Sequence, residues 1–90
     1  MSKKEKLLNR FLLRPCVNDF AWDDFVTLMK QLDFKLHEKA GGGSHKYFIF
    51  NKDESKVINT SKPHPSGLLK VWQIKEVTDK LKEWQLIDYE

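Results

Sequence analysis

Apolar residues recur along this chain first with the spacing of a helix, then with that of strands, and then again with that of a helix. In "KKEKLLNRFLLR" four apolar residues share one face of a short amphipathic helix: Leu7, Leu8, Phe11 and Leu12. Pro15 is expected to stop this helix. The segment "AWDDFVTLMKQLDF" repeats the helical spacing and places acidic residues in the first turn, where the helix dipole favours negative charge. Two helices are therefore predicted before the spacing changes.

From residue 34 onward apolar and polar residues alternate, which is typical of strands. Three segments, "FKLHE", "HKYFIF" and "KVINT", are predicted to be strands, joined by "KAGGGS" and by the turn-like "NKDES". After the loop "SKPHPSG", helical spacing returns at Ile74, Val77, Leu81 and Trp84. The prediction is an α+β domain over residues 1–90, with an extra N-terminal helix followed by a helix, a three-stranded antiparallel sheet and a closing helix.

Composition narrows the class of protein. A chain of 90 residues with 40% hydrophobic and 12% aromatic content suits one compact domain. Its apolar runs are much shorter than a membrane span, and Asn9 and Arg10 interrupt the apolar part of its basic N-terminus, which argues against a secretory signal. Cys16 is the only cysteine, so no intrachain disulfide or zinc set is expected. We expect a cytoplasmic protein with no metal or other cofactor and no membrane partner.

The positive charge is concentrated in the middle of the chain. The net charge is +3 and the sequence pI is about 9.0. Residues 35–75 hold eight lysines and all three histidines against three acidic residues. A positive surface of this kind favours a polyanion such as RNA, because cationic side chains displace counterions from phosphates. Ordinary solvated lysines are the alternative interpretation.

The stretch "AGGGSHKYFIF" brings three glycines, a serine and a histidine directly before a predicted strand. RNA is cut without a metal when its own 2′-hydroxyl attacks the neighbouring phosphate, which needs a base, an acid and positive charge. His45 could serve as acid or base, because an unperturbed histidine titrates near pH ~6.5. The backbone at Gly42 and Gly43 could approach a phosphate closely, and Ser44 could bind a phosphate oxygen or orient the imidazole. Without further context, a flexible turn before an exposed strand end explains the same residues.

The loop before the closing helix contains a second histidine, His64, between two prolines. A helix N-terminus favours anions, so this loop is a candidate phosphate site with Lys62 and Lys70 on either side of it. A stiff proline-rich turn is the alternative explanation. Strand alternation places Lys46 on the face opposite His45, and His37 at the surface.

Most aromatic residues are expected in the core rather than on RNA. Tyr47 and Trp72 are less certain, and Trp72 lies off the apolar face of the closing helix, where it could meet RNA or a partner. Six aromatic residues fall on inward-looking positions: Trp22, Phe25, Phe34, Phe48, Phe50 and Trp84. The first helix could pack on this core, dock a partner chain or offer its lysines to RNA, and it needs some such surface because so short a helix is marginal in water.

Four segments together resemble the HicA family of bacterial toxins: "FAWDDFVTLMKQLDFKL", "GGSHKYFIF", "KPHPSG" and "LKEWQLI". The resemblance covers residues 20–87 and leaves residues 2–14 as an N-terminal helical extension. It implies a fold like that of double-stranded-RNA-binding domains, a ribonuclease activity on messenger RNA, and a cognate HicB antitoxin as partner. It also implies that His45 is the functional residue.

The chain departs from the family pattern at three helix ends. Glycine would be usual at Asp33 and Gln85, and threonine or serine would be usual at the helix-capping position of Ala21, with Asp19 as another possible cap. Positions 33 and 85 suit left-handed backbone, which Asp tolerates better than Gln. These departures bear on stability more than on chemistry.

Two functions of different class follow from the sequence. The first is a metal-independent endoribonuclease toxin in which His45 is the acid or base. In that case the candidate RNA-binding residues are Gly42, Gly43, Ser44, Lys62, His64 and Lys70. The second is a non-catalytic module of the same fold that binds RNA or a protein partner.

Overall fold

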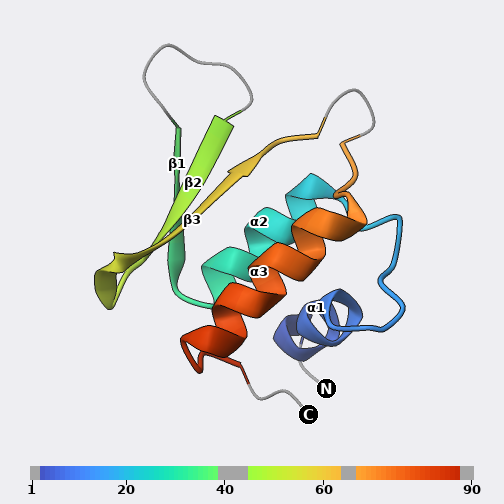
Figure 1. Cartoon of the computed structure of the whole chain (residues 1–90), viewed down its shortest axis with the longest axis horizontal. Coiled ribbons are helices and arrows are strands. Elements are labelled where there is room, and N and C mark those ends of the chain that lie inside the picture. The colour runs from blue at the N-terminus through green and yellow to red at the C-terminus, as the bar shows by residue number, and fades with distance from the viewer. Residues whose placement is uncertain (1–2, 39–44, 64–66, 88–90) are drawn as a thin grey trace.

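The computed structural model of the chain describes residues 3–38, 45–63 and 67–87 (Figure 1). Its elements run in the order α1 (Lys3–Phe11), α2 (Trp22–Gln31), β1 (Phe34–Glu38), β2 (His45–Phe50), β3 (Asp53–Ser61) and α3 (Val71–Glu83). The predicted α+β organisation, with a three-stranded antiparallel sheet and flanking helices, is confirmed. No helix in these described ranges is both long enough and apolar enough to cross a membrane.

Helix α1 packs on the core, which is the first of the three roles considered for it. Phe11 is only 1% exposed, and its ring lies 5.3 Å from that of Phe20 and 5.8 Å from that of Phe25. Figure 1 shows α1 across the helical layer from the sheet. The helix ends at Phe11 rather than at Arg14 as predicted. Pro15 disfavours helical backbone at Arg14, so the helix ends before the proline as expected.

The start of α2 lacks a side-chain cap. Ala21 occupies the N-cap position and makes no capping hydrogen bond. The alternative cap, Asp19, was a wrong prediction, because its carboxylate instead accepts a hydrogen bond of 2.6 Å from the Arg10 guanidinium. Asp23 and Asp24 do lie in the first turn of α2, where they complement the helix dipole.

The sheet has the order β1-β2-β3 with antiparallel pairing throughout. Strand β3 begins at Asp53, earlier than the predicted segment "KVINT", and only Asn51 and Lys52 form the turn before it. A shift in register between Ile49 and Phe50 brings Asp53 opposite Phe50, so the last three residues of the predicted turn join the strand.

One face of the sheet packs against α2 and α3 and forms the core. The Phe48 ring on β2 lies 5.3 Å from Phe25 and 6.1 Å from Trp22, both of α2. Trp84 is half-buried and stacks 6.4 Å from Phe34, while the other five aromatic residues expected inside are buried. The buried apolar residues come from all six elements and from two loop positions: Phe11, Phe20, Trp22, Phe25, Leu28, Met29, Phe34, Phe48, Phe50, Ile58, Leu69, Ile74, Val77 and Leu81.

Both helix ends that were expected to suit left-handed backbone do adopt it. Asp33 has φ 69° and Gln85 has φ 56°, and each directly follows the C-cap of its helix. After α3, the Gln85 amide donates to the Lys82 carbonyl and the Leu86 amide donates to the Leu81 carbonyl. This pair of bonds is the Schellman motif, in which the residue after the C-cap must turn left-handed.

Candidate functional site

One end of the molecule gathers the start of β2, the end of β3 and the starts of both α2 and α3 (Figure 1). Two backbone hydrogen bonds of 2.8 Å hold this end together: the Trp22 amide donates to the Gly67 carbonyl, and the Leu69 amide donates to the Phe20 carbonyl. Gly67 has φ 71°, a conformation that a residue with a Cβ adopts only at a cost. The segments before the two helices are thereby fixed to each other at the end of the sheet.

His45 lies at this end as the first residue of β2, and its side chain is exposed. It pairs across the sheet with Ser61, the last residue of β3. The Ser61 hydroxyl oxygen lies 3.4 Å from His45 Nδ1, at the long end of hydrogen-bond distance. A hydroxyl both donates and accepts, so Ser61 can orient the imidazole in either tautomer and leave Nε2 for a ligand.

A cavity of about 210 Å³ adjoins His45 at the junction of β3 and α3. The indole of Trp72 is 56% exposed, so it offers a ring on which a base can stack. Glu76, one turn further along α3, adds a carboxylate. The lining combines an imidazole, a hydroxyl, an amide, an indole and a carboxylate: His45, Asn59, Thr60, Ser61, Trp72 and Glu76.

Gln73 ties α3 to the strand end that carries Ser61. Its side chain is only 5% exposed. Its Nε2 donates to the Ser61 carbonyl oxygen at 3.0 Å, and its Oε1 accepts from the Lys70 backbone amide at 2.9 Å. Because Gln73 lies between Trp72 and Glu76 in the first turns of α3, this bridge fixes both cavity residues relative to the strand.

Both lysines expected to bind phosphate, Lys62 and Lys70, are described by the structure. Lys62 is half-buried and directly follows Ser61, and Lys70 is exposed at the N-cap position of α3. Both lie at the end of the molecule that holds His45, but neither lines its cavity. The other four predicted site residues, Gly42, Gly43, Ser44 and His64, lie outside the described residues.

Lys46 lies on the opposite face from His45, as strand alternation predicted. Its ammonium donates a hydrogen bond of 2.9 Å to the Glu38 carboxylate across the sheet. This bond and the positive charge of Lys46 lower the pKa of Glu38 below its usual value. Lys46 is therefore engaged in a structural ion pair next to the site.

The face of the sheet away from the helices carries a second histidine. His37 on β1 pairs with Tyr47 on β2, and their rings stack 5.1 Å apart at an interplanar angle of 12°. His37 lies on the outer face of the sheet, as expected, and it is half-buried there because Tyr47 covers one side of its ring. Since Tyr47 and His45 are two residues apart on β2, the stacked pair and His45 share this face.

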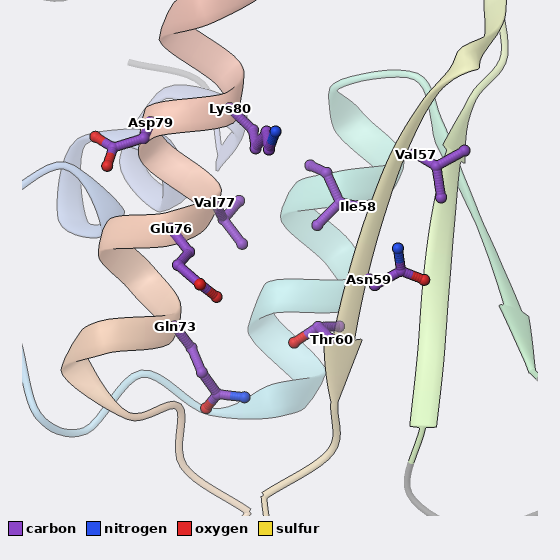
Figure 2. A pocket seen from close by; sticks show the side chains of 9 residues that line it. All are labelled: Val57, Ile58, Asn59, Thr60, Gln73, Glu76, Val77, Asp79 and Lys80. Atoms are coloured by element: carbon purple, nitrogen blue, oxygen red, sulfur yellow. The ribbon is translucent and has the colours of Figure 1, made fainter.

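A larger cavity of about 430 Å³ lies between α3 and the edge of β3, and Figure 2 shows nine residues that line it. It shares Asn59, Thr60 and Glu76 with the cavity beside His45. In Figure 2 the Glu76 side chain points from α3 into the space toward β3, whereas Asp79 points away from the strand. Glu76 therefore stands where the two cavities meet.

Within residues 3–38, 45–63 and 67–87, no three or more His, Cys, Asp or Glu side chains are grouped so that they could hold a metal ion. Comparison of the chain with protein-family models, with curated proteins and with solved structures found no match.

Sequence reasoning missed Ser61, Gln73 and Glu76. The signal for Ser61 was present, because antiparallel pairing of the predicted strands brings the end of β3 opposite the start of β2. For Glu76 the available signal was its spacing of four from the exposed Trp72, which places both on one helix face. Gln73 gave no signal, because its burial depends on how α3 meets β3.

Proposed function

We propose that this protein is an endoribonuclease toxin that cuts messenger RNA without a metal ion and uses His45 as general acid or base. The observation that carries the proposal is the position of His45: an exposed imidazole beside the Ser61 hydroxyl, in a cavity that also holds the indole of Trp72. Single-stranded RNA is commonly bound by stacking its bases on aromatic rings, so this cavity suits a nucleotide next to the scissile phosphate.

The chemistry required of the site is modest. The 2′-hydroxyl of the RNA attacks the adjacent phosphorus, the bond to the 5′-oxygen breaks, and a proton must leave one oxygen and reach the other. A positioned imidazole contributes about 10²–10⁴-fold to such a proton transfer. Lys62 and Lys70 supply positive charge at the same end of the molecule, and Gly42, Gly43, Ser44 and His64 remain predicted contacts to the phosphate.

Two features of the fold support the resemblance to the HicA family. The succession of α2, three antiparallel strands and α3 is the order that a fold like that of double-stranded-RNA-binding domains requires. In addition, Asp33 and Gln85, where the family pattern has glycine, are the two non-glycine residues with positive φ in the described part of the chain. Glycine is favoured where φ is positive, so the family pattern suits this backbone at both helix ends.

The proposal includes a cognate HicB-like antitoxin that blocks the toxin. The half-exposed Trp72 beside His45 offers an anchor for such a partner, because buried tryptophans dominate many protein interfaces. A small antitoxin-like reading frame beside the gene for this chain would support this part of the proposal.

Induced expression in bacterial cells tests the toxin proposal. Cells that express the wild-type chain should stop growing and lose intact messenger RNA, while cells that express His45→Ala at the same level should grow and keep it. Growth and messenger RNA that stay at uninduced levels with the wild-type chain would contradict the proposal.

A non-catalytic module that binds RNA or a protein partner is the second candidate function. The exposed indole of Trp72 favours it, because a binder would use that ring equally well without any proton transfer. The two candidates differ in one respect that can be measured: the module binds RNA and leaves it intact.

A further inference from the structure

Cleavage through a 2′-hydroxyl needs two proton transfers, and His45 alone provides one group. This inference rests on the proposed ribonuclease function and concerns the group that completes it. The second group must share a space with His45, reach a bound nucleotide and not be held in a structural ion pair. In the described part of the chain, Glu76 meets these conditions.

Glu76 lines the same 210 Å³ cavity as His45, with Asn59, Ser61 and Trp72 among the other lining residues. Its side chain is exposed, and Figure 2 shows it pointing from α3 toward β3. The bridge from Gln73 to the Ser61 carbonyl holds this part of α3 against the strand that positions His45.

The Glu76 carboxylate is also available to a bound nucleotide. Its carboxylate makes no hydrogen bond or ion pair with any residue that the structure describes. Two other acidic residues are engaged in ion pairs: Glu38 with Lys46 at 2.9 Å and Glu83 with Lys80 at 3.7 Å. Asp79 lines only the larger cavity and points away from the strand. A carboxylate oxygen accepts hydrogen bonds, so Glu76 can accept one from the 2′-hydroxyl of a bound nucleotide.

We propose that Glu76 is the second catalytic residue: its carboxylate is the general base and the His45 imidazolium is the general acid. Glu76 takes the proton of the 2′-hydroxyl while the 2′-oxygen bonds to phosphorus. The bond from phosphorus to the 5′-oxygen then breaks, and His45 gives its proton to that oxygen. The products are a 2′,3′-cyclic phosphate and a free 5′-hydroxyl, and the carboxylic acid and the neutral imidazole later return to their starting states by exchange with water.

Trp72 has a positioning role in this arrangement. It precedes Glu76 by four residues on α3, so both side chains lie on the same side of the helix. A base stacked on the exposed indole would bring its ribose, and therefore its 2′-hydroxyl, next to the carboxylate. Trp72→Ala should raise KM more than it lowers kcat, because stacking binds substrate and transition state alike.

The test compares Glu76→Gln with Glu83→Gln, which makes the same chemical change on the same helix outside either cavity. Each purified protein is given a defined single-stranded RNA in the presence of a metal chelator. Both kcat and kcat/KM are measured across pH. Glu76→Gln should lower kcat about 10²–10⁴-fold. Its affinity for the same RNA with 2′-deoxyribose at the cleavage site should stay within about threefold, a shift under roughly 0.7 kcal/mol.

The pH profile distinguishes a catalytic base from a residue that only shapes the cavity. Wild-type kcat/KM should rise and then fall with pH, because the base must be ionised and the acid protonated. Glu76→Gln should lose the rising limb, Glu76→Asp should keep it at reduced rate, and Glu83→Gln should match the wild type. The wild-type products should end in 2′,3′-cyclic phosphate.

Two results would overturn the inference, and they differ in what they say of the proposed function. If the wild type cuts RNA in a His45-dependent way and Glu76→Gln cuts at the same rate with the same pH profile, Glu76 is not the base and the ribonuclease stands. If the wild type cuts no RNA, the proposed function fails and the role of Glu76 fails with it.

Discussion

The side-chain amide of Gln73 donates a hydrogen bond of 3.0 Å to the backbone carbonyl of Ser61, and so joins the first turn of α3 to the last residue of β3. Ser61 is also the residue whose hydroxyl lies 3.4 Å from the His45 imidazole. One buried glutamine therefore sets the position of α3, with Trp72 and Glu76, relative to the strand pair that carries His45.

Removal of this bridge should cost stability. Gln73→Leu removes two part-buried hydrogen bonds, one to the Ser61 carbonyl and one from the Lys70 amide, and each contributes about 1 kcal/mol. Urea denaturation should show a free energy of unfolding lower by about 2 kcal/mol, the sum of the two losses. Gln31→Leu is the matched control, because Gln31 Oε1 is buried without a hydrogen-bond partner among the described residues, and its removal should not lower the free energy of unfolding. Equal effects of the two variants would contradict this role of Gln73.

Helix α1 should be part of the folded unit rather than a loose extension. Phe11→Ala removes a ring packed between Phe20 and Phe25 and should lower the free energy of unfolding by about 3–5 kcal/mol. Leu13→Ala, just past the helix, should change it by less than about 0.5 kcal/mol, because Leu13 is 52% exposed. A Phe11→Ala protein as stable as the wild type would mean that α1 does not contribute to the core in solution.

Gln85 lies in a left-handed conformation that glycine adopts without steric cost. Gln85→Gly should therefore raise the free energy of unfolding by about 1 kcal/mol, the order of the penalty for a residue with a Cβ. Lys75→Gly, in the exposed interior of α3, should lower it by about 1 kcal/mol. Thermal unfolding of both variants checks the opposite signs, and a loss of stability in Gln85→Gly would refute the conformational argument.

The first residues of β3 should make stability depend on pH in the acid range. Hydrogen bonds from the Lys56 ammonium and from the Ser55 hydroxyl and amide lower the pKa of Asp53 well below its usual value. The folded state thus binds this proton less readily than the unfolded chain, in which Asp has a pKa near ~3.9. The contribution is complete above that pH and is lost as the pH falls toward the lower folded-state pKa.

Denaturation of the wild type and of Asp53→Asn checks this dependence. The wild type should be the more stable at pH 7, and the difference should shrink at about pH 3, where Asp53 is protonated in most unfolded chains but remains ionised in the folded state. A difference that stays constant between the two pH values would show that the charge of Asp53 does not stabilise the fold through Ser55 and Lys56.

Local sequence patterns predicted much of the fold. Alternation along "HKYFIF" placed His45 and Phe48 on opposite faces, and helical spacing found the buried face of α3. The left-handed backbone at Asp33 and Gln85 was expected because the family that the sequence resembles usually has glycine at both helix ends. These features depend on residues close together in sequence.

The features that sequence missed depend on contacts between distant elements. Asp19 binds Arg10 of α1 instead of capping α2. The packing of α1 brings the Arg10 guanidinium to 2.6 Å from the Asp19 carboxylate. The cavity beside His45 forms only when α3 docks along β3, so the contributions of Ser61 and Glu76 could not be found from spacing alone. Asp53 joined β3 through a register shift that no propensity encodes.

Cleavage of a defined single-stranded RNA in a metal chelator is the most direct test of the central claim. His37→Ala is the matched control for His45→Ala, because His37 is the other described histidine on the same face of the sheet and stacks on Tyr47 instead of lining the cavity. The account predicts that the wild type and His37→Ala cut the RNA while His45→Ala binds it and leaves it intact. Equal cutting by all three proteins, or binding without cutting by all three, would contradict the account.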